Sequence, residues 1–220
     1  MHSMLFFSFA AALFFTACSK APSPQIESHA AKAVSSELQI VKSENQLTGF
    51  YDKLKAFDLD MDIGKFYNIT PDFISEQSAY AIFKDDKSCM SFIMYEGELY
   101  ETGPYFGGFG ITGMALADLD KDNRDELYYT FSSGSGMHRS HIGYFNPAAK
   151  EIMLFEYTYL DHDMMLTTTE SGDLCVNEAA VTGESFVDFT VNAGKEIGRI
   201  FLKDNSITID MAGQDDSRLQ

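Results

Sequence analysis

Short apolar segments separated by turn residues recur along this chain at intervals of about ten residues. Tight turns of this kind join antiparallel strands, whereas parallel strands need long crossover connections. The pattern therefore predicts a mainly β fold of antiparallel sheets, and a sandwich, an open barrel and a propeller-like meander all fit it. The expected turns are Glu96-Gly97, Asn146-Pro147, Asn192-Ala193-Gly194 and Asp204-Asn205, the last two within a three-stranded meander over residues 187–209.

One or two short helices are expected ahead of these strands. Residues 46–57 carry apolar side chains at helical spacing and predict a short amphipathic helix. Thr70 followed by Pro71 is typical of a helix N-cap with proline at the first helical position, and this second helix should end near Gln77.

An acidic segment in the middle of the chain carries the clearest chemical signal. Asp118, Asp120 and Asp122 alternate, and Glu126 follows four residues later. These side chains occupy positions 1, 3, 5 and 9 of a short loop, and the backbone carbonyl of Arg124 occupies position 7. Because Ca²⁺ takes six to eight oxygen ligands at about 2.3–2.6 Å, this spacing predicts one Ca²⁺ site.

The residues around these ligands indicate which kind of loop they form. Position 6 must turn sharply, and Asn123 is the non-glycine residue that best tolerates the left-handed conformation there. Residues 114–117 and 127–131 alternate as strands do, and an EF-hand would need helices in both places. The alternative is an acidic turn that binds no ion, but its four crowded carboxylates would repel one another without a cation.

Together with the preceding Phe106-Gly107-Gly108-Phe109-Gly110, this strand–loop–strand unit resembles the calcium loops of the FG-GAP and VCBS repeats of integrin-like proteins. The resemblance covers about twenty residues and implies Ca²⁺ binding in the loop. It departs from the pattern at Asn123, where glycine is usual, and at Glu126, where aspartate is usual. The chain holds one good copy, so a propeller built from repeats is not supported.

The N-terminal residues 1–17 predict an export signal that is followed directly by Cys18. Their apolar run is shorter than the roughly twenty residues of a membrane span and fits a secretory signal. The small residues before Cys18 resemble a bacterial lipobox, although Phe15 replaces the commoner leucine and no Lys or Arg precedes it. The resemblance implies cleavage before Cys18, acylation of that cysteine and attachment to the membrane. An ordinary signal peptide is the alternative. By analogy with diderm lipoproteins, Ser19 implies the outer membrane of a bacterial cell envelope.

Three further parts follow the signal peptide. Residues 18–45 carry prolines, serines and little apolar bulk, which predicts a flexible tether. Residues 46–212 predict a single mainly β globular domain with room for a core, and residues 213–220 form a C-terminal tail. The net charge of −17 argues against nucleic acid as a partner, because a polyanion would be repelled.

A glycine-rich segment follows the strand after the acidic loop. Its Ser135, His138, Arg139 and His141 are candidates for ligand binding. The segment can be a structural turn, a Ser–His catalytic pair, or part of a metal site. Catalysis needs adjacency in space and an oxyanion hole, and a zinc site would need His162 or its flanking aspartates as further ligands. Beside the acidic loop, the segment resembles a group of bacterial exported proteins, which implies no activity.

Two features leave alternatives open. Asp58, Asp60 and Asp62 also alternate, but Phe66 stands where the ninth-position carboxylate belongs, so a strand with an acidic face is favoured over a second Ca²⁺ site. Cys89 and Cys175 either form a disulfide, which an oxidising compartment permits, or remain two buried thiols.

Two functions fit these observations. The preferred hypothesis is a membrane-anchored, exported, calcium-binding domain that serves without catalysis as a scaffold or as a binding module for a surface protein or glycan. The alternative is an extracytoplasmic hydrolase that uses residues 138–141 beside the calcium loop. A pocket that joins His138, Arg139 and His141 to a further acid would favour the hydrolase, whereas a closed, hydrogen-bonded turn would favour the scaffold.

Overall fold

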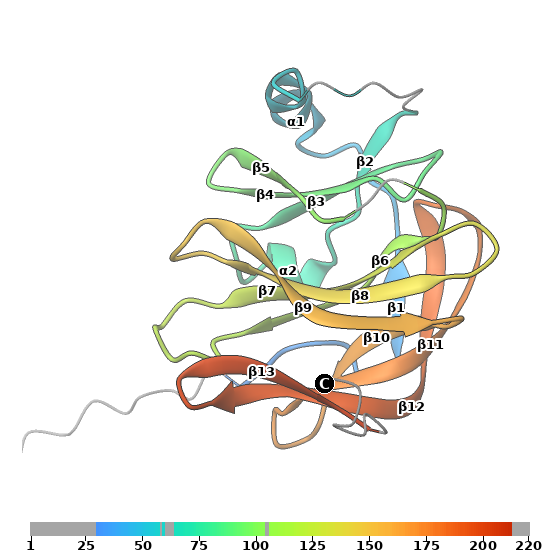
Figure 1. The fold of residues 1–220 in the computed structure, drawn as a ribbon. Coiled ribbons are helices and arrows are strands. Elements are labelled where there is room, and N and C mark those ends of the chain that lie inside the picture. Colours follow the sequence, from blue (N-terminus) through green and yellow to red (C-terminus); the bar gives the residue numbers. More distant parts are fainter. Residues whose placement is uncertain (1–29, 58, 60–63, 104–105, 213–220) are drawn as a thin grey trace, which may run out of the picture.

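A computed structural model of the chain describes residues 30–57, 59, 64–103 and 106–212 (Figure 1). The features that lie outside these residues are the predicted signal peptide, residues 18–29 of the predicted tether with the lipidation site Cys18, the C-terminal tail, and Asp58, Asp60 and Asp62. Within the described residues, no helix has both the length and the hydrophobicity needed to cross a membrane.

The described residues form three antiparallel sheets and two short helices, which confirms the predicted mainly β fold. Sheet I contains β2 (Phe66–Asn68), β3 (Ala81–Asp85), β4 (Ser91–Tyr95) and β5 (Glu98–Glu101), in that order. Sheet II contains β6 (Gly110–Ala117), β7 (Glu126–Ser133), β8 (Arg139–Asn146) and β9 (Glu151–Leu160), also in chain order. Sheet III contains β1 (Glu37–Ile40), β12 (Asp188–Lys203), β11 (Leu174–Ser185) and β10 (Asp163–Thr168) in this spatial order, and β13 (Ser206–Met211) pairs with β12.

Sheet II lies between the other two sheets (Figure 1), and every residue of its strands β6 and β7 is buried. Side chains leave a strand alternately on its two faces. Tyr129 and Phe131 therefore pack in a cluster shared with sheet I, and Tyr128 packs in another with Met164 of β10. Because both faces are covered, the loop between β6 and β7 is held by two fully buried strands.

Several predicted turns are confirmed. Glu96 and Gly97, and likewise Asp204 and Asn205, have the positive φ angles that two-residue hairpin turns require. The turn after Asn146 is also present, and the Asn146 side chain accepts hydrogen bonds from the next backbone N–H groups.

The predicted turn at Asn192-Ala193-Gly194 is wrong. These residues lie inside β12, where Asn192 pairs with Ala180 and Ala193 pairs with Ala179 of β11. The pairing of β11 with β12 shifts register around Asn177, and with these shifts the two strands stay paired through residues 192 and 193. Pairing along two long strands thus overrides the local turn preference, and the predicted meander becomes one long strand followed by β13.

The predicted tether of residues 18–45 extends too far. Leu38 and Ile40 are buried, and β1 pairs with β12 from Glu37 opposite Asn192 to Ile40 opposite Phe189. Four residues with alternating burial are enough to form an edge strand when a longer strand is present to receive them.

Both predicted helices are present in shortened form. The first is α1 (Leu47–Leu54), which buries Phe50 and Leu54. The second is α2 (Asp72–Ser75), and its N-cap is Pro71 rather than Thr70. The Thr70 hydroxyl donates to the Asn68 side chain and accepts from the Ile82 backbone, so it does not cap the helix.

Cys89 and Cys175, the two cysteines among the described residues, are both buried and form no disulfide with each other. Cys89 belongs to the cluster shared by the three sheets, whereas Cys175 lies on β11. The disulfide alternative is therefore wrong.

Candidate metal centre

The acidic loop closes a hairpin between β6 and β7. The last residue of β6, Ala117, is paired with the first residue of β7, Glu126. Asn123 has a φ of 68°, which confirms the left-handed turn predicted at position 6, and Lys121 is left-handed as well. Both ends of the loop are therefore fixed by the central sheet.

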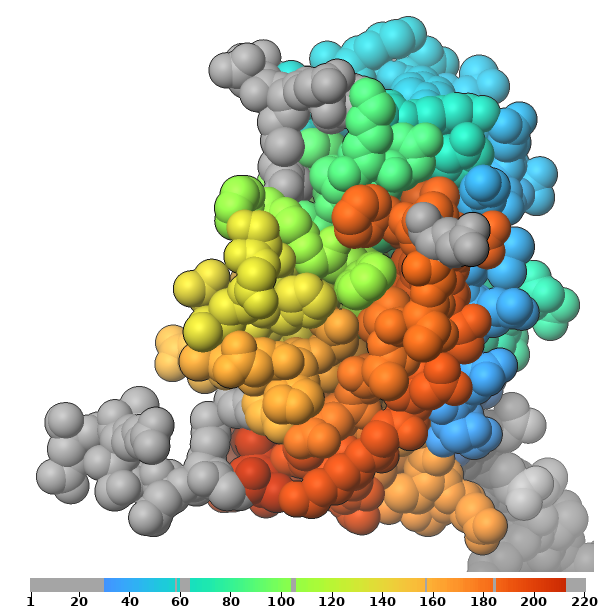
Figure 2. Space-filling model, turned by 90° about the vertical axis from the view of Figure 1, so that its right-hand side faces the viewer, coloured from blue at the N-terminus to red at the C-terminus, as the bar shows by residue number. Residues whose placement is uncertain are grey.

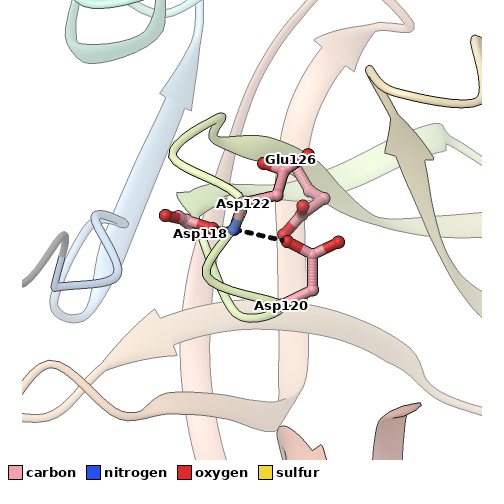
Figure 3. Close-up of side chains that lie close together, drawn as sticks. All are labelled: Asp118, Asp120, Asp122 and Glu126. Atoms are coloured by element: carbon pink, nitrogen blue, oxygen red, sulfur yellow. Dashed lines mark hydrogen bonds between the residues drawn. The ribbon is translucent and has the colours of Figure 1, made fainter. Parts of the chain in front are cut away.

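The four carboxylates predicted as ligands converge (Figure 3). One oxygen from each of Asp118, Asp120, Asp122 and Glu126 lies within 4.8 Å of the others. Among the described residues, these four are the only group of three or more His, Cys, Asp or Glu side chains placed to hold a metal ion. All four are hard oxygen donors, the type that Ca²⁺ and Mg²⁺ accept.

Backbone N–H groups hold three of these carboxylates in place. Asp118 accepts from the N–H groups of Asp122 and Asn123, each at 3.0 Å. Asp120 accepts from Asp122 at 3.1 Å, and Asp122 accepts from the N–H of Arg124 at 2.8 Å. The Arg124 side chain is exposed, and the contribution predicted for this residue is its backbone carbonyl oxygen.

Glu126 differs from the other three because it is fully buried. Its Oε2 accepts hydrogen bonds from the Leu119 N–H at 3.2 Å and from the Tyr128 hydroxyl at 3.0 Å. Its Oε1 makes no hydrogen bond within the described residues. A buried carboxylate oxygen normally has a hydrogen-bond partner or a bound ion, so Oε1 is available to a ligand.

The pKa values of Glu126 and Asp120 show that burial and mutual repulsion disfavour the ionised carboxylates. Burial and then the Asp120 carboxylate raise the pKa of Glu126 to about 8. Burial also raises the pKa of Asp120, and the neighbouring Asp122 and Asp118 carboxylates raise it further. A divalent cation at the centre of the four oxygens would reverse these effects, because it favours the ionised form of every carboxylate.

Tyr128 was not anticipated as part of the site. Its ring lies in the buried cluster beneath sheet II, and its hydroxyl fixes the orientation of Glu126. The sequence does carry a signal for this contact: Glu126 and Tyr128 are two residues apart in a strand, so their side chains lie on the same face. Such support of a ligand by a hydrogen-bonded neighbour is usual at metal sites.

The glycine-rich segment packs by its backbone against the loop that precedes β6. Gly107 bridges to Gly134, and the Gly134 N–H donates to the Phe106 carbonyl at 2.6 Å. A Cβ on Gly107 would lie 2.6 Å from the carbonyl carbon of Gly134, so this approach requires glycine. In Figure 2, the lime segment that precedes β6 lies between yellow and orange-red parts of the chain.

The polar residues of the glycine-rich segment do not assemble into one site. His138 Nδ1 lies 3.1 Å from Asp163 Oδ1, whereas His141 Nδ1 lies 3.4 Å from the Thr158 hydroxyl. Ser135 is exposed at the tip of the turn. The three histidines considered for zinc, including His162, form no metal-holding group within the described residues.

Hydrogen bonds close the glycine-rich segment as a turn. The Ser140 hydroxyl donates to the His162 carbonyl at 2.8 Å, and the Asp161 N–H donates to the His138 carbonyl at 3.0 Å. The side chain of Arg139, which begins β8, is exposed. Of the two outcomes set out above, the geometry corresponds to the hydrogen-bonded turn.

Comparisons with protein-family models, with curated proteins and with solved structures found no match to this chain. The chemistry of the site itself is therefore the basis for assigning a function.

Proposed function

We propose that this protein is a calcium-binding module that acts without catalysis, with one Ca²⁺ held in the loop between β6 and β7. Its ligands are Asp118, Asp120, Asp122, Glu126 and the carbonyl oxygen of Arg124. The observation that carries the proposal is the Glu126 carboxylate, which is fully buried yet leaves Oε1 without a hydrogen bond in the described part of the chain.

The donor set favours Ca²⁺ over other common ions. All side-chain donors are carboxylate oxygens, whereas Zn²⁺ sites in proteins usually include His or Cys. Mg²⁺ demands near-ideal octahedral geometry and keeps several waters, which suits a cage of four carboxylates poorly. Ca²⁺ accepts six to eight oxygens in flexible geometry, so it fits a loop of this kind.

Binding would stabilise the centre of the fold. The loop joins two strands that are buried throughout, and the mutual repulsion of its carboxylates opposes the closed hairpin. A bound cation removes that repulsion and fixes the ends of both strands. The module can then present a rigid surface to a protein or glycan partner.

The sequence supports a place for this module in the bacterial cell envelope. The apolar N-terminal run and the small residues before Cys18 support export, acylation at that cysteine and attachment to the membrane, with the outer membrane favoured by Ser19.

Calorimetric titration of the full-length protein with CaCl₂ tests the metal site. We expect one Ca²⁺ per chain, a calcium-dependent rise in melting temperature, and much weaker binding of Mg²⁺. Asp120→Asn and Glu126→Gln should each weaken Ca²⁺ binding by about tenfold or more, since each removes a charged ligand. Without calcium, Glu126→Gln should melt no lower than the wild type, because burial already favours the uncharged form of this carboxyl group and the amide has nearly the same shape.

The matched control is Asp125→Asn, which makes the same charge change at a loop position that is not a predicted ligand. It should change the affinity for Ca²⁺ by less than about threefold. Equal weakening by Asp125→Asn would mean that the charge of the loop alone drives binding. Absence of any binding heat at millimolar CaCl₂ would contradict the proposed Ca²⁺ site.

The hydrolase alternative retains one supporting observation, the contact between His138 and Asp163. A carboxylate on Nδ1 can orient a histidine as a base. However, no hydroxyl or thiol group is hydrogen-bonded to His138 within the described residues, and His141 contacts Thr158 instead. The non-catalytic role is therefore the better supported of the two.

A further inference from the structure

A cavity of about 710 Å³ lies beside the acidic loop of residues 118–126, here named the metal loop after the proposed Ca²⁺ site. Its wall combines four segments that are distant in the sequence: the start of the described chain, the loop between β6 and β7, the turn between β10 and β11 with the first residue of β11, and the C-terminal end of β12. The lining residues used below are Asp118, Lys121, Asn123, Ser171, Asp173 and Phe201. A cavity of this volume is in the range of small-molecule sites, which is about 300–1,000 Å³.

Asp118 connects this cavity to the proposed metal site. It contributes an oxygen to the carboxylate cluster and also lines the cavity. Lys121 and Asn123, from the same loop, line the cavity with backbone in the left-handed conformation. Any ion that orders the loop would therefore order one wall of the cavity.

The charges of the wall disfavour an anionic ligand. The lining residues carry two carboxylates, Asp118 and Asp173, and one ammonium group, that of Lys121. Arg199, at 3.9 Å from Asp173, offsets part of this negative charge. The repulsion of an anion therefore comes mainly from the adjoining carboxylate cluster and from the net charge of −17 of the whole chain. The Asp173 carboxylate also accepts a hydrogen bond from the Ser171 hydroxyl at 2.7 Å. A phosphate or carboxylate would meet repulsion here, whereas an uncharged ligand would not.

The polar groups of the wall suit a ligand rich in hydroxyl groups. Carboxylates accept hydrogen bonds, an ammonium group donates them, and amide and hydroxyl groups do both. A hydroxyl group on a ligand is at once donor and acceptor, so it can pair with each of these wall residues. A purely apolar ligand would leave them unpaired, at a cost in binding free energy.

The rest of the wall is apolar and includes an exposed aromatic ring. Leu174 and Ile200 line the cavity and are almost fully buried, whereas Phe201 is 37% exposed. An exposed aromatic ring beside polar groups can cover the apolar face of a ligand whose other edges are polar. Sugars combine an apolar ring face with hydroxyl groups around the edge.

We infer that this cavity binds a neutral carbohydrate, with its hydroxyl groups on the polar wall residues and its ring face on Phe201. The inference rests on the proposed calcium site, because Ca²⁺ would order the wall that contains Asp118, Lys121 and Asn123. It specifies the glycan partner in chemical terms: uncharged, and of one or two sugar units given the cavity volume.

Saturation-transfer NMR of the full-length protein tests this inference with glucose, galactose, mannose, fucose and N-acetylglucosamine at millimolar concentration. We expect at least one of these sugars to bind in CaCl₂, and its signal to disappear in EGTA. Phe201→Ala should weaken that binding by about tenfold, and Phe201→Tyr should restore it because the aromatic face is kept. Glucuronic acid, which carries a carboxylate, should bind more weakly than glucose.

A second cavity, of about 590 Å³, supplies the matched control because it is lined by Phe73 and lies away from the metal loop. Phe73→Ala should leave sugar binding unchanged, and loss of binding on Phe73→Ala alone would assign the sugar to that cavity and overturn the inference. Calorimetry separates the two proposals. If Ca²⁺ binds but none of the five sugars does, the inference fails and the metal site stands, whereas absence of Ca²⁺ binding removes the metal site.

Discussion

At the scale of single residues, two buried ionisable groups stand out because they have opposite charge. Glu126 belongs to the metal loop, whereas Lys84 on β3 is fully buried far from it in the sequence. The Lys84 ammonium donates to the Phe186 carbonyl and lies 5.2 Å from the ring centroids of both Phe186 and Phe189. Lys84 thereby ties sheet I to the hairpin between β11 and β12, and the aromatic rings replace part of the hydration that its charge has lost.

Burial lowers the pKa of Lys84 to about 7, against the weaker opposite effects of Cys89 and Asp85. The unfolded chain, with an ordinary lysine pKa near 10.5, therefore binds more protons than the folded protein between about pH 7 and 10.5. The contribution of Lys84 to folding stability should consequently rise with pH through the lower part of this window, whereas Glu126, whose pKa is raised, contributes in the opposite direction up to about pH 8. We expect a gain of roughly 1–3 kcal/mol between pH 7 and 9 from Lys84.

Urea unfolding of the wild type and of Lys84→Met at several pH values measures this contribution. The variant keeps the apolar stem but cannot be protonated, so its stability should rise less with pH from 7 to 9 than that of the wild type. Identical pH dependence of the two proteins would mean that the Lys84 pKa is not depressed in the folded state.

At the scale of secondary structure, the long strand β12 organises sheet III. It pairs with β11 along one side, and with β1 and β13 at different positions along its length. The short β1 depends on this arrangement, since an isolated four-residue strand has no stability of its own. In return, Leu38 and Ile40 cover part of the cluster shared by the three sheets.

A pair of truncations tests the role of β1. Deletion of residues 1–45 removes β1 and should lower the free energy of unfolding by roughly 3–5 kcal/mol, because two buried aliphatic side chains and a strand ladder are lost. Deletion of residues 1–29 keeps every described residue and should cost less than about 1 kcal/mol. Equal midpoints in urea for both truncations would show that β1 adds little to the fold.

At the scale of the whole molecule, the metal loop and the cavity beside it share a wall with the start of the described chain. Ala30 and Ala31 line the cavity, and the Ala31 N–H donates to the Gly172 carbonyl at 3.3 Å. The proposed lipid anchor at Cys18 is 12 residues before Ala30 in the sequence. An extended segment of that length spans at most about 40 Å, so an anchored protein would keep the cavity close to the membrane surface.

Replacement of Cys18 by alanine tests the anchor. Acyl chains on Cys18 would supply the attachment, so Cys18→Ala should move the protein from the membrane fraction to the soluble fraction of cells. Cys89→Ala, which alters a buried thiol, should leave the protein with the membranes. Retention of the Cys18→Ala protein on membranes after a carbonate wash would contradict lipidation at this position.

The acidic loop shows which features of the site can be predicted from the sequence alone. The spacing of Asp118, Asp120 and Asp122 and the left-handed Asn123 are local properties, set by steric limits on a few neighbouring residues, so they were predictable. The flanking strands were predictable for the same reason, because alternation along a strand needs no distant partner. The same local reasoning failed at Asn192-Ala193-Gly194, where pairing with β11 overrides the turn.

By itself, the sequence determined the mainly β class, the strand–loop–strand unit and the identity of the clustered carboxylates. Only the tertiary structure decided that Glu126 is buried against Tyr128, that Cys89 and Cys175 stay apart, and that β1 joins sheet III. It also decided that a cavity forms where the metal loop meets β12. The physical reason is that burial and strand pairing depend on residues far apart in the chain, whose contacts appear only when the sheets pack together.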